Sequence, residues 1–151
     1  MIQSPERTSF DRITEHVHLG SRIASLDDYH RLRAHGIRAC VDMKDEGADP
    51  WTFESFLWLP TVDHQAPSLH NLQLGIGFLD RCERAKVPAL VHCLAGIGRS
   101  TTLVLAYLLA TSHRGRPTRD VLDLIRLRRP LANPTPPQLL AAEEAARRFE
   151  A

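Results

Sequence analysis

The stretch Ala89–Thr102, which reads ALVHCLAGIGRSTT, decides how the rest of the chain is interpreted. Its first four residues have the character of a buried strand, its middle contains Gly96 and Gly98, and its end opens an apolar segment typical of a buried helix. A strand, a glycine-containing loop and a helix in this order gather backbone N–H groups and a helix N-terminus around one point. The sequence therefore predicts an anion-binding loop.

The segments on either side of this loop alternate between strand and helix patterns. We expect strands at 16–20, 37–43 and 89–92, and a helical turn in Trp51–Leu57 that leads into a strand ending at Leu59–Pro60. Apolar residues at helical spacing predict helices at 25–35, 69–85, 100–112, 118–128 and 136–149. This alternation predicts a three-layer α/β fold, in which helices flank a central, mostly parallel sheet of about four or five strands.

The bulk properties narrow the class of protein. A length of 151 residues fits one domain spanning 1–151, of which we expect 1–14 to be a flexible N-terminal segment. A net charge of +1 gives no field that would attract nucleic acid or a membrane surface. Three cysteines without a C-x-x-C pair argue against a disulfide framework and a zinc site, and no signal peptide is evident. We expect a cytoplasmic monomer without a metal.

The chemistry of the loop centres on Cys93. We expect this side chain to act as a thiolate nucleophile, because a helix N-terminus and a nearby Arg favour the ionised form of a cysteine. Arg99 can grip two phosphate oxygens through its planar guanidinium. Ser100 has a hydroxyl that can donate to the thiolate, and His92 is expected to hold the loop in place. The remaining loop residues are expected to bind phosphate: Leu94, Ala95, Gly96, Ile97 and Gly98.

The order His92-Cys93, five residues, Arg99-Ser100 resembles the HC-x5-R-S/T signature of the cysteine-based protein tyrosine phosphatase superfamily. The size of the chain and the stretches VHLGSRIAS, HGIRACVDMKDEG and RRPLANPTPPQ are similar to its compact dual-specificity branch. Thr101 departs from the Gly that is usual in tyrosine-specific members. The resemblance implies a phosphocysteine intermediate and no cofactor. Rhodanese-like and arsenate-reductase-like proteins are the alternatives, but the two glycines and the Ser after Arg favour the phosphatase.

The resemblance also implies a general acid, because a departing alkoxide or phenoxide needs a proton. In this family a loop Asp before the cysteine supplies it. Asp63 lies thirty residues before Cys93, in a loop between Pro60 and Pro67, and is therefore the expected acid, with His64 as the weaker candidate. Because an ordinary aspartate is ionised at pH 7, we expect an acidic or near-neutral optimum for turnover.

Three further residues are candidates for a role in or near the site. Gln138 resembles the glutamine that positions the hydrolytic water in tyrosine-specific members, and an ordinary first-turn helix residue is an equal alternative. Cys40 and Cys82 are expected to be core or surface thiols, and a regulatory disulfide with Cys93 stays open because it requires Cα atoms within about 7 Å.

Two polar regions are expected to face solvent. The first is the loop Lys44–Pro50, in which Asp45 and Asp49 are interpreted as turn residues, whereas Asp42 ends the preceding strand. The second is a basic helix surface formed by Arg114, Arg116, Arg119, Arg126, Arg128 and Arg129.

Three functions remain open at this point. The first is a protein phosphatase for phosphotyrosine, with phosphoserine and phosphothreonine as further substrates. The second is a phosphatase for a small phosphate ester such as a phosphoinositide or nucleotide, but the loop CLAGIGR lacks the Lys that such enzymes often carry. The third is a phosphate-binding pseudophosphatase, against which the intact Cys93, Arg99 and Asp63 argue.

Overall fold

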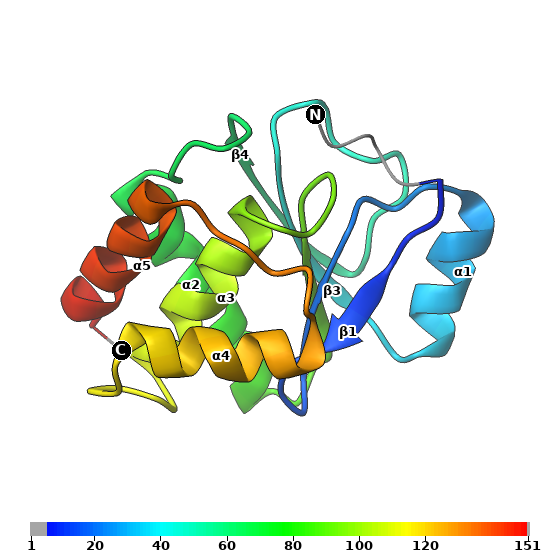
Figure 1. The fold of residues 1–151 in the computed structure, drawn as a ribbon. Coiled ribbons are helices and arrows are strands. Elements are labelled where there is room, and N and C mark those ends of the chain that lie inside the picture. The colour runs from blue at the N-terminus through cyan, green and yellow to red at the C-terminus, as the bar shows by residue number, and fades with distance from the viewer. Residues whose placement is uncertain (1–5, 151) are drawn as a thin grey trace.

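A computed structural model of the protein describes residues 6–150. It contains a five-stranded sheet with helices on both faces (Figure 1). The elements follow in the order β1 (Phe10–Arg12), β2 (Val17–Gly20), α1 (Leu26–Ala34), β3 (Ala39–Lys44), β4 (Ser55–Thr61), α2 (Leu69–Arg84), β5 (Ala89–His92), α3 (Arg99–Ala110), α4 (Thr118–Arg128) and α5 (Pro136–Arg148).

The strands lie in the order β1-β2-β5-β3-β4, and only the β1–β2 pair is antiparallel. β3 and β5 occupy the centre and are buried at every residue, as expected for parallel strands covered on both faces. The predicted three-layer α/β fold is therefore confirmed. Because parallel strands all end at one edge of the sheet, the loops after β3, β4 and β5 meet there.

The two faces of the sheet carry cores of unequal size. Leu32 of α1 packs with Cys40 and Leu90 on one face, whereas α2 to α5 cover the other face (Figure 1). Every residue of α3 is buried, which agrees with the central helix expected from its apolar sequence. No helix among the described residues has the length and apolar character needed to cross a membrane.

Two local expectations differ from the structure. The helical turn expected within Trp51–Leu57 is wrong, because residues 55–61 form β4, whose register against β3 places Phe56 opposite Cys40. β1 lies in the N-terminal segment that was expected to be flexible, and three residues at a sheet edge are too few to show periodicity. Residues 1–5 of that segment lie outside the described part of the chain.

Candidate active site

Cys93 is the first residue after β5, and α3 begins six residues later at Arg99. The side chain is 3% exposed, and its Sγ lies 3.1 Å from the Ser100 hydroxyl oxygen. Ser100 is fully buried in the first turn of α3, so its hydroxyl can donate a hydrogen bond to a thiolate at this position. The structure thus brings together the expected nucleophile and the hydroxyl expected to support it.

The loop 93–99 leaves backbone donors available at the start of α3. No side chain caps this helix, and its first turn contains no acidic residue, so its N-terminal N–H groups remain open to an anion. Gly96 has a φ of +73°, and a Cβ there would lie 2.5 Å from the carbonyl oxygen of Gly20. Gly98 has a φ of −111°, which any residue can adopt, so glycine is not required there for the backbone conformation. It is required for space, because a Cβ would lie 2.9 Å from Gln138 Oε1.

Arg99 is almost fully buried, and its N–H groups divide into two sets. Nη1 donates to Glu46 Oε1 and to the Thr61 carbonyl, both at 2.8 Å, and Nη2 donates to Glu46 Oε2 at 3.2 Å. Nε is buried and has no hydrogen-bond partner. One edge of the guanidinium is therefore fixed by Glu46, whereas Nε and the second Nη2 hydrogen form a free edge suited to two oxygens of a phosphate.

Glu46 was not expected in the site, since the loop Lys44–Pro50 was interpreted only as polar. Its hydrogen bond with Arg99 lowers the pKa of the Glu46 carboxyl. Burial alone would lower the pKa of Arg99, but the hydrogen bond to Glu46 and the negative charges of Cys93, Glu46 and Asp63 together raise it. Both partners are thus held in their charged forms. Glu46 and Arg99 are fifty-three residues apart in the sequence, so no local sequence pattern could have indicated that they pair.

Arg129 corrects a second expectation. It was grouped with a solvated arginine surface, yet it is 1% exposed and lies behind the loop. Its Nε donates to the Gly96 carbonyl at 2.8 Å, and its Nη2 donates to the Ala95 carbonyl at 3.1 Å. A loop that turns its N–H groups toward a ligand turns carbonyls outward, and Arg129 satisfies two of them. Its other end contacts Asp11 of β1 at 2.9 Å.

The loop after β4 places Asp63 in the same pocket. The Asp63 side chain is half exposed, and its Oδ1 lies 3.6 Å from Arg99 Nε. His64 has a φ of 66°, which is uncommon for a residue with a side chain, and its Nε2 lies 3.5 Å from Asp63 Oδ2. The acid expected from the sequence therefore lies near the free edge of Arg99, with a histidine beside it.

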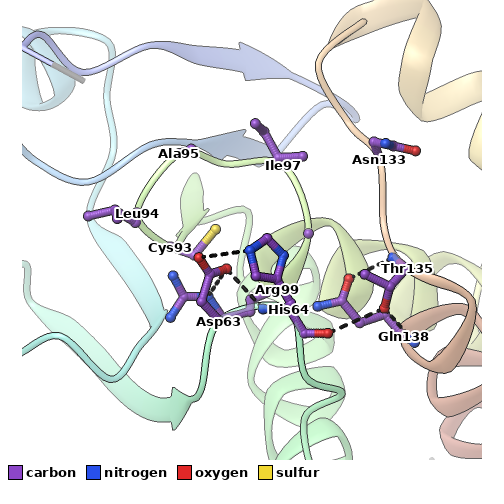
Figure 2. A pocket seen from close by; sticks show the side chains of 11 residues that line it. Asp63, His64, Cys93, Leu94, Ala95, Ile97, Arg99, Asn133, Thr135 and Gln138 are labelled. Carbon is purple, nitrogen blue, oxygen red and sulfur yellow. Dashed lines mark hydrogen bonds and ion pairs between the residues drawn. The ribbon is translucent and has the colours of Figure 1, made fainter. Parts of the chain in front are cut away.

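These groups surround a pocket of about 180 Å³ (Figure 2). The loop 93–99 forms one wall, and Thr135 and Gln138, at the start of α5, form another. Gly96 is not among the residues that line the pocket, and its carbonyl accepts from Arg129; its expected contact with phosphate stays a prediction. The lining residues are Asp63, His64, Cys93, Leu94, Ala95, Ile97, Gly98, Arg99, Asn133, Thr135 and Gln138.

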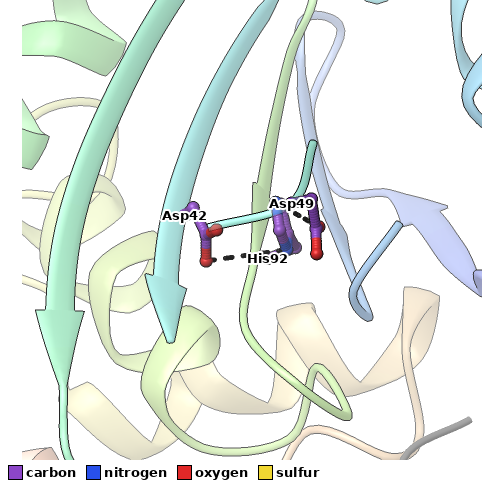
Figure 3. Close-up of side chains that lie close together, drawn as sticks. All are labelled: Asp42, Asp49 and His92. Carbon is purple, nitrogen blue, oxygen red and sulfur yellow. Dashed lines mark ion pairs between the residues drawn. The ribbon is translucent and has the colours of Figure 1, made fainter. Parts of the chain in front are cut away.

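Below the loop, His92 approaches one buried and one partly buried carboxylate (Figure 3). Its ring nitrogens lie 3.9 Å from Asp42 and 3.8 Å from Asp49, and Nδ1 lies 3.3 Å from the Cys93 carbonyl. Lys44 Nζ bonds the same carboxylates at 2.9 and 3.0 Å. Asp42, Asp49 and His92 have spacing that suits a cation, but the Lys44 ammonium already pairs with both carboxylates. The cluster is an internal ion-pair network that anchors both ends of the loop carrying Glu46.

The other two thiols lie away from Cys93. Cys40 lies opposite Leu90 in the sheet. Leu90 in turn precedes Cys93 by about 10 Å of extended chain. The Cys82 carbonyl accepts from Val87 N at the amino end of β5, whereas Cys93 follows its carboxyl end. All three cysteines are free, and burial raises the pKa of both Cys40 and Cys82. These positions do not meet the distance that a disulfide with Cys93 requires.

Comparison with known proteins accounts for this arrangement. The family model of the dual specificity phosphatase catalytic domain matches residues 17–145. The chain belongs to the dual specificity phosphatase family. The resemblance noted in the sequence, to the compact dual-specificity branch of the cysteine-based phosphatases, is confirmed.

Individual phosphatases are similar over shorter stretches. Human dual specificity protein phosphatase 15 is 40% identical over 83 residues, which cover 54% of this chain and 28% of that protein. Human dual specificity protein phosphatase 22 is 36% identical over 108 residues, which cover 71% of this chain and 58% of that protein. The chain thus spans less than two thirds of the length of these curated relatives.

Solved phosphatase structures extend the similarity to the fold. The crystal structure of DUSP15 has a TM-score of 0.79 and 30% identity, covering 91% of this chain and 86% of that one. The structure of Tk-PTP in the active form has a TM-score of 0.78 and 27% identity, covering 93% of this chain and 98% of that one.

Proposed function

We propose that this protein is a phosphatase that hydrolyses phosphate esters on proteins through a phosphocysteine intermediate. The observation that carries the proposal is the free edge of the buried Arg99, which lies at the mouth of an uncapped helix beside the Cys93 thiol. Membership of the dual specificity phosphatase family supports it. We further propose that residues 1–151 act as a single phosphatase domain in a reducing compartment such as the cytoplasm, where a reactive thiol stays free.

In the first step the Cys93 thiolate attacks phosphorus. The S–P bond forms as the bond from phosphorus to the ester oxygen breaks, and Asp63 gives its proton to the departing oxygen. The backbone N–H groups of the loop and the free edge of Arg99 hold the remaining phosphate oxygens. Because Glu46 already fixes the other edge of the guanidinium, Arg99 needs little reorganisation to bind the transition state.

In the second step water attacks the phosphocysteine. The Asp63 carboxylate accepts a proton from the water while the P–S bond breaks, and the Ser100 hydroxyl donates to the sulfur as it leaves as a thiolate. Inorganic phosphate is released, and Asp63 is protonated again for the next cycle. Asp63 must therefore start protonated, so we expect turnover to favour an acidic or near-neutral pH.

The walls of the pocket support a broad choice of phosphorylated side chain. Among the described residues that line it, none is Tyr, Phe or Trp, and the one aromatic ring is the imidazole of His64, whose side chain is 75% exposed, so no buried aromatic wall selects a phenyl ring. The pocket also contains no Lys, which disfavours a substrate carrying several phosphates. We propose phosphotyrosine together with phosphoserine and phosphothreonine as substrates, in preference to a phosphoinositide or nucleotide.

Turnover of aryl phosphates and phosphopeptides tests the proposal. We expect wild type to release phosphate from both, and Cys93→Ser to be inactive because it lacks the nucleophile. Asp63→Asn should lose about 10²- to 10⁴-fold in kcat on a substrate with a poor leaving group. A wild-type protein that binds phosphopeptides without turnover would show a phosphate-binding module, and turnover confined to inositol phosphates would reassign the substrate.

A further inference from the structure

The loop that carries Asp63 is fastened to the start of α5 by two side chains. Thr135 Oγ1 donates to the His64 carbonyl over 3.4 Å, and Gln138 Nε2 donates to the Gln65 carbonyl over 2.9 Å. Its other hydrogen bonds within the described part of the chain are local turn contacts. The long-range hydrogen bonds of this half-exposed loop therefore come from α5.

The Gln138 side chain is itself held rigidly. It is fully buried, and its Oε1 accepts from Thr135 N at 2.9 Å, while Thr135 Oγ1 accepts from Gln138 N at 3.3 Å. These reciprocal bonds form a capping box at the start of α5. The amide oxygen and one amide hydrogen are thus both committed, and Gly98 provides the space in which the amide lies.

We infer that Gln138, assisted by Thr135, is a positioning residue that clamps the acid loop so that Asp63 stays over Cys93. The inference rests on the proposed function, since it assigns Asp63 to the transfer of the proton. Packing does little to fix the position of the half-exposed Asp63 side chain. The hydrogen bond from the buried Gln138 amide to the Gln65 carbonyl, two residues away, fixes the backbone of the loop instead. Glutamate would complete the same capping box but has no hydrogen to donate to the Gln65 carbonyl.

The test compares Gln138→Met with Gln73→Met. Gln73 Nε2 donates to the Ala145 carbonyl at 2.9 Å, so it makes a similar contact to α5 away from the pocket. We expect Gln138→Met to reduce kcat/KM, which reports the transfer step and not the later hydrolysis, about 10²-fold on phenyl phosphate, a poor leaving group, and much less on 4-nitrophenyl phosphate. Gln73→Met should leave the ratio of the two rates at its wild-type value.

A second background separates a clamp from a direct role. In Asp63→Asn protein, Gln138→Met should cause no further loss, because the group that the clamp positions can no longer donate. An equal loss on both substrates that persists in Asp63→Asn would overturn the inference and would assign Gln138 to the hydrolytic water.

Hydrogen exchange provides a readout that does not depend on turnover. Amides of residues 62–66 should exchange faster in Gln138→Met than in wild type or Gln73→Met, because their long-range anchor is lost. Unchanged exchange rates in an active enzyme would refute the clamp. Inactivity of the wild-type protein would refute the proposed function, and the exchange rates would then still test whether Gln138 anchors the loop.

Discussion

Two buried arginines perform complementary tasks on opposite sides of one loop. Arg99 offers donors to the position where phosphate would bind, whereas Arg129 donates to the carbonyls of Gly96 and Ala95 that face away from it. Each is paired with a partly exposed carboxylate, Glu46 for the first and Asp11 for the second. The loop 93–99 therefore depends on a positive charge on each of its two sides.

Glu46→Gln tests the support of Arg99. The pKa of Glu46 is lowered by its hydrogen bond with Arg99, so the carboxylate stabilises the fold at pH values above its ordinary pKa. This contribution disappears as the pH falls through the lowered value. We expect wild type to exceed Glu46→Gln in free energy of unfolding at about pH 7 and to converge with it once the pH falls below the lowered pKa of Glu46.

Urea unfolding at a series of pH values measures this difference. A difference between the two proteins that stays constant from neutral to acidic pH would show that the charge on Glu46 does not stabilise Arg99. The same variant should bind orthovanadate more weakly, because the guanidinium loses the partner that orients its free edge.

At the scale of elements, α2 contains two glycines, of which Gly75 packs against α3 and Gly77 does not. A Cβ at Gly75 would lie 2.6 Å from a methyl carbon of Leu103, whereas a Cβ at Gly77 would meet nothing within 4 Å. Both glycines lower the intrinsic helix propensity of α2, so the sequence alone gives no reason to distinguish them.

The pair Gly75→Ala and Gly77→Ala should change stability in opposite directions. We expect Gly75→Ala to lose about 1–3 kcal/mol, because an added methyl overpacks the contact with Leu103. Gly77→Ala should gain about 0.5–1 kcal/mol through helix propensity. Chemical denaturation of both variants measures this, and a gain in both would show that the α2–α3 contact can relax.

At the scale of the whole molecule, the site joins distant parts of the chain. The contact between Arg129 and Asp11 closes a separation of 118 residues and ties the edge strand β1 to the catalytic loop. Its two ends differ in environment, since Arg129 is buried whereas the Asp11 side chain is 40% exposed.

Arg129→Met should therefore cost far more than Asp11→Asn. Removal of the guanidinium leaves the buried Gly96 carbonyl and the partly buried Ala95 carbonyl unpaired, with a loss of about 1–3 kcal/mol for a fully buried unsatisfied group and less for a partly buried one. Loss of the partly exposed carboxylate should cost at most about 1 kcal/mol. Thermal unfolding and orthovanadate affinity measure both effects, and equal losses would show that the ion pair, rather than the loop carbonyls, is what Arg129 supports.

The sequence predicted the features that are local in the chain. The strand, loop and helix around Cys93, with Arg99 and Ser100, follow from one stretch of fourteen residues. The contacts made by Glu46 and Arg129 could not be predicted, because they depend on how separate loops meet at one edge of the sheet. The start of β4 could not be predicted either, because its pairing with β3, rather than its own pattern, fixes where the strand begins.

The isolation of Cys93 from the other thiols has a consequence for oxidative damage. A thiolate attacked by peroxide becomes a sulfenic acid, which a neighbouring cysteine can capture before further oxidation. Cys40 and Cys82 are buried at other positions, so neither can serve as a resolving partner. We expect peroxide followed by glutathione to give a single mixed disulfide by intact mass, and an internal disulfide in its place would contradict this. Recovery of the enzyme would then depend on thiols from its surroundings.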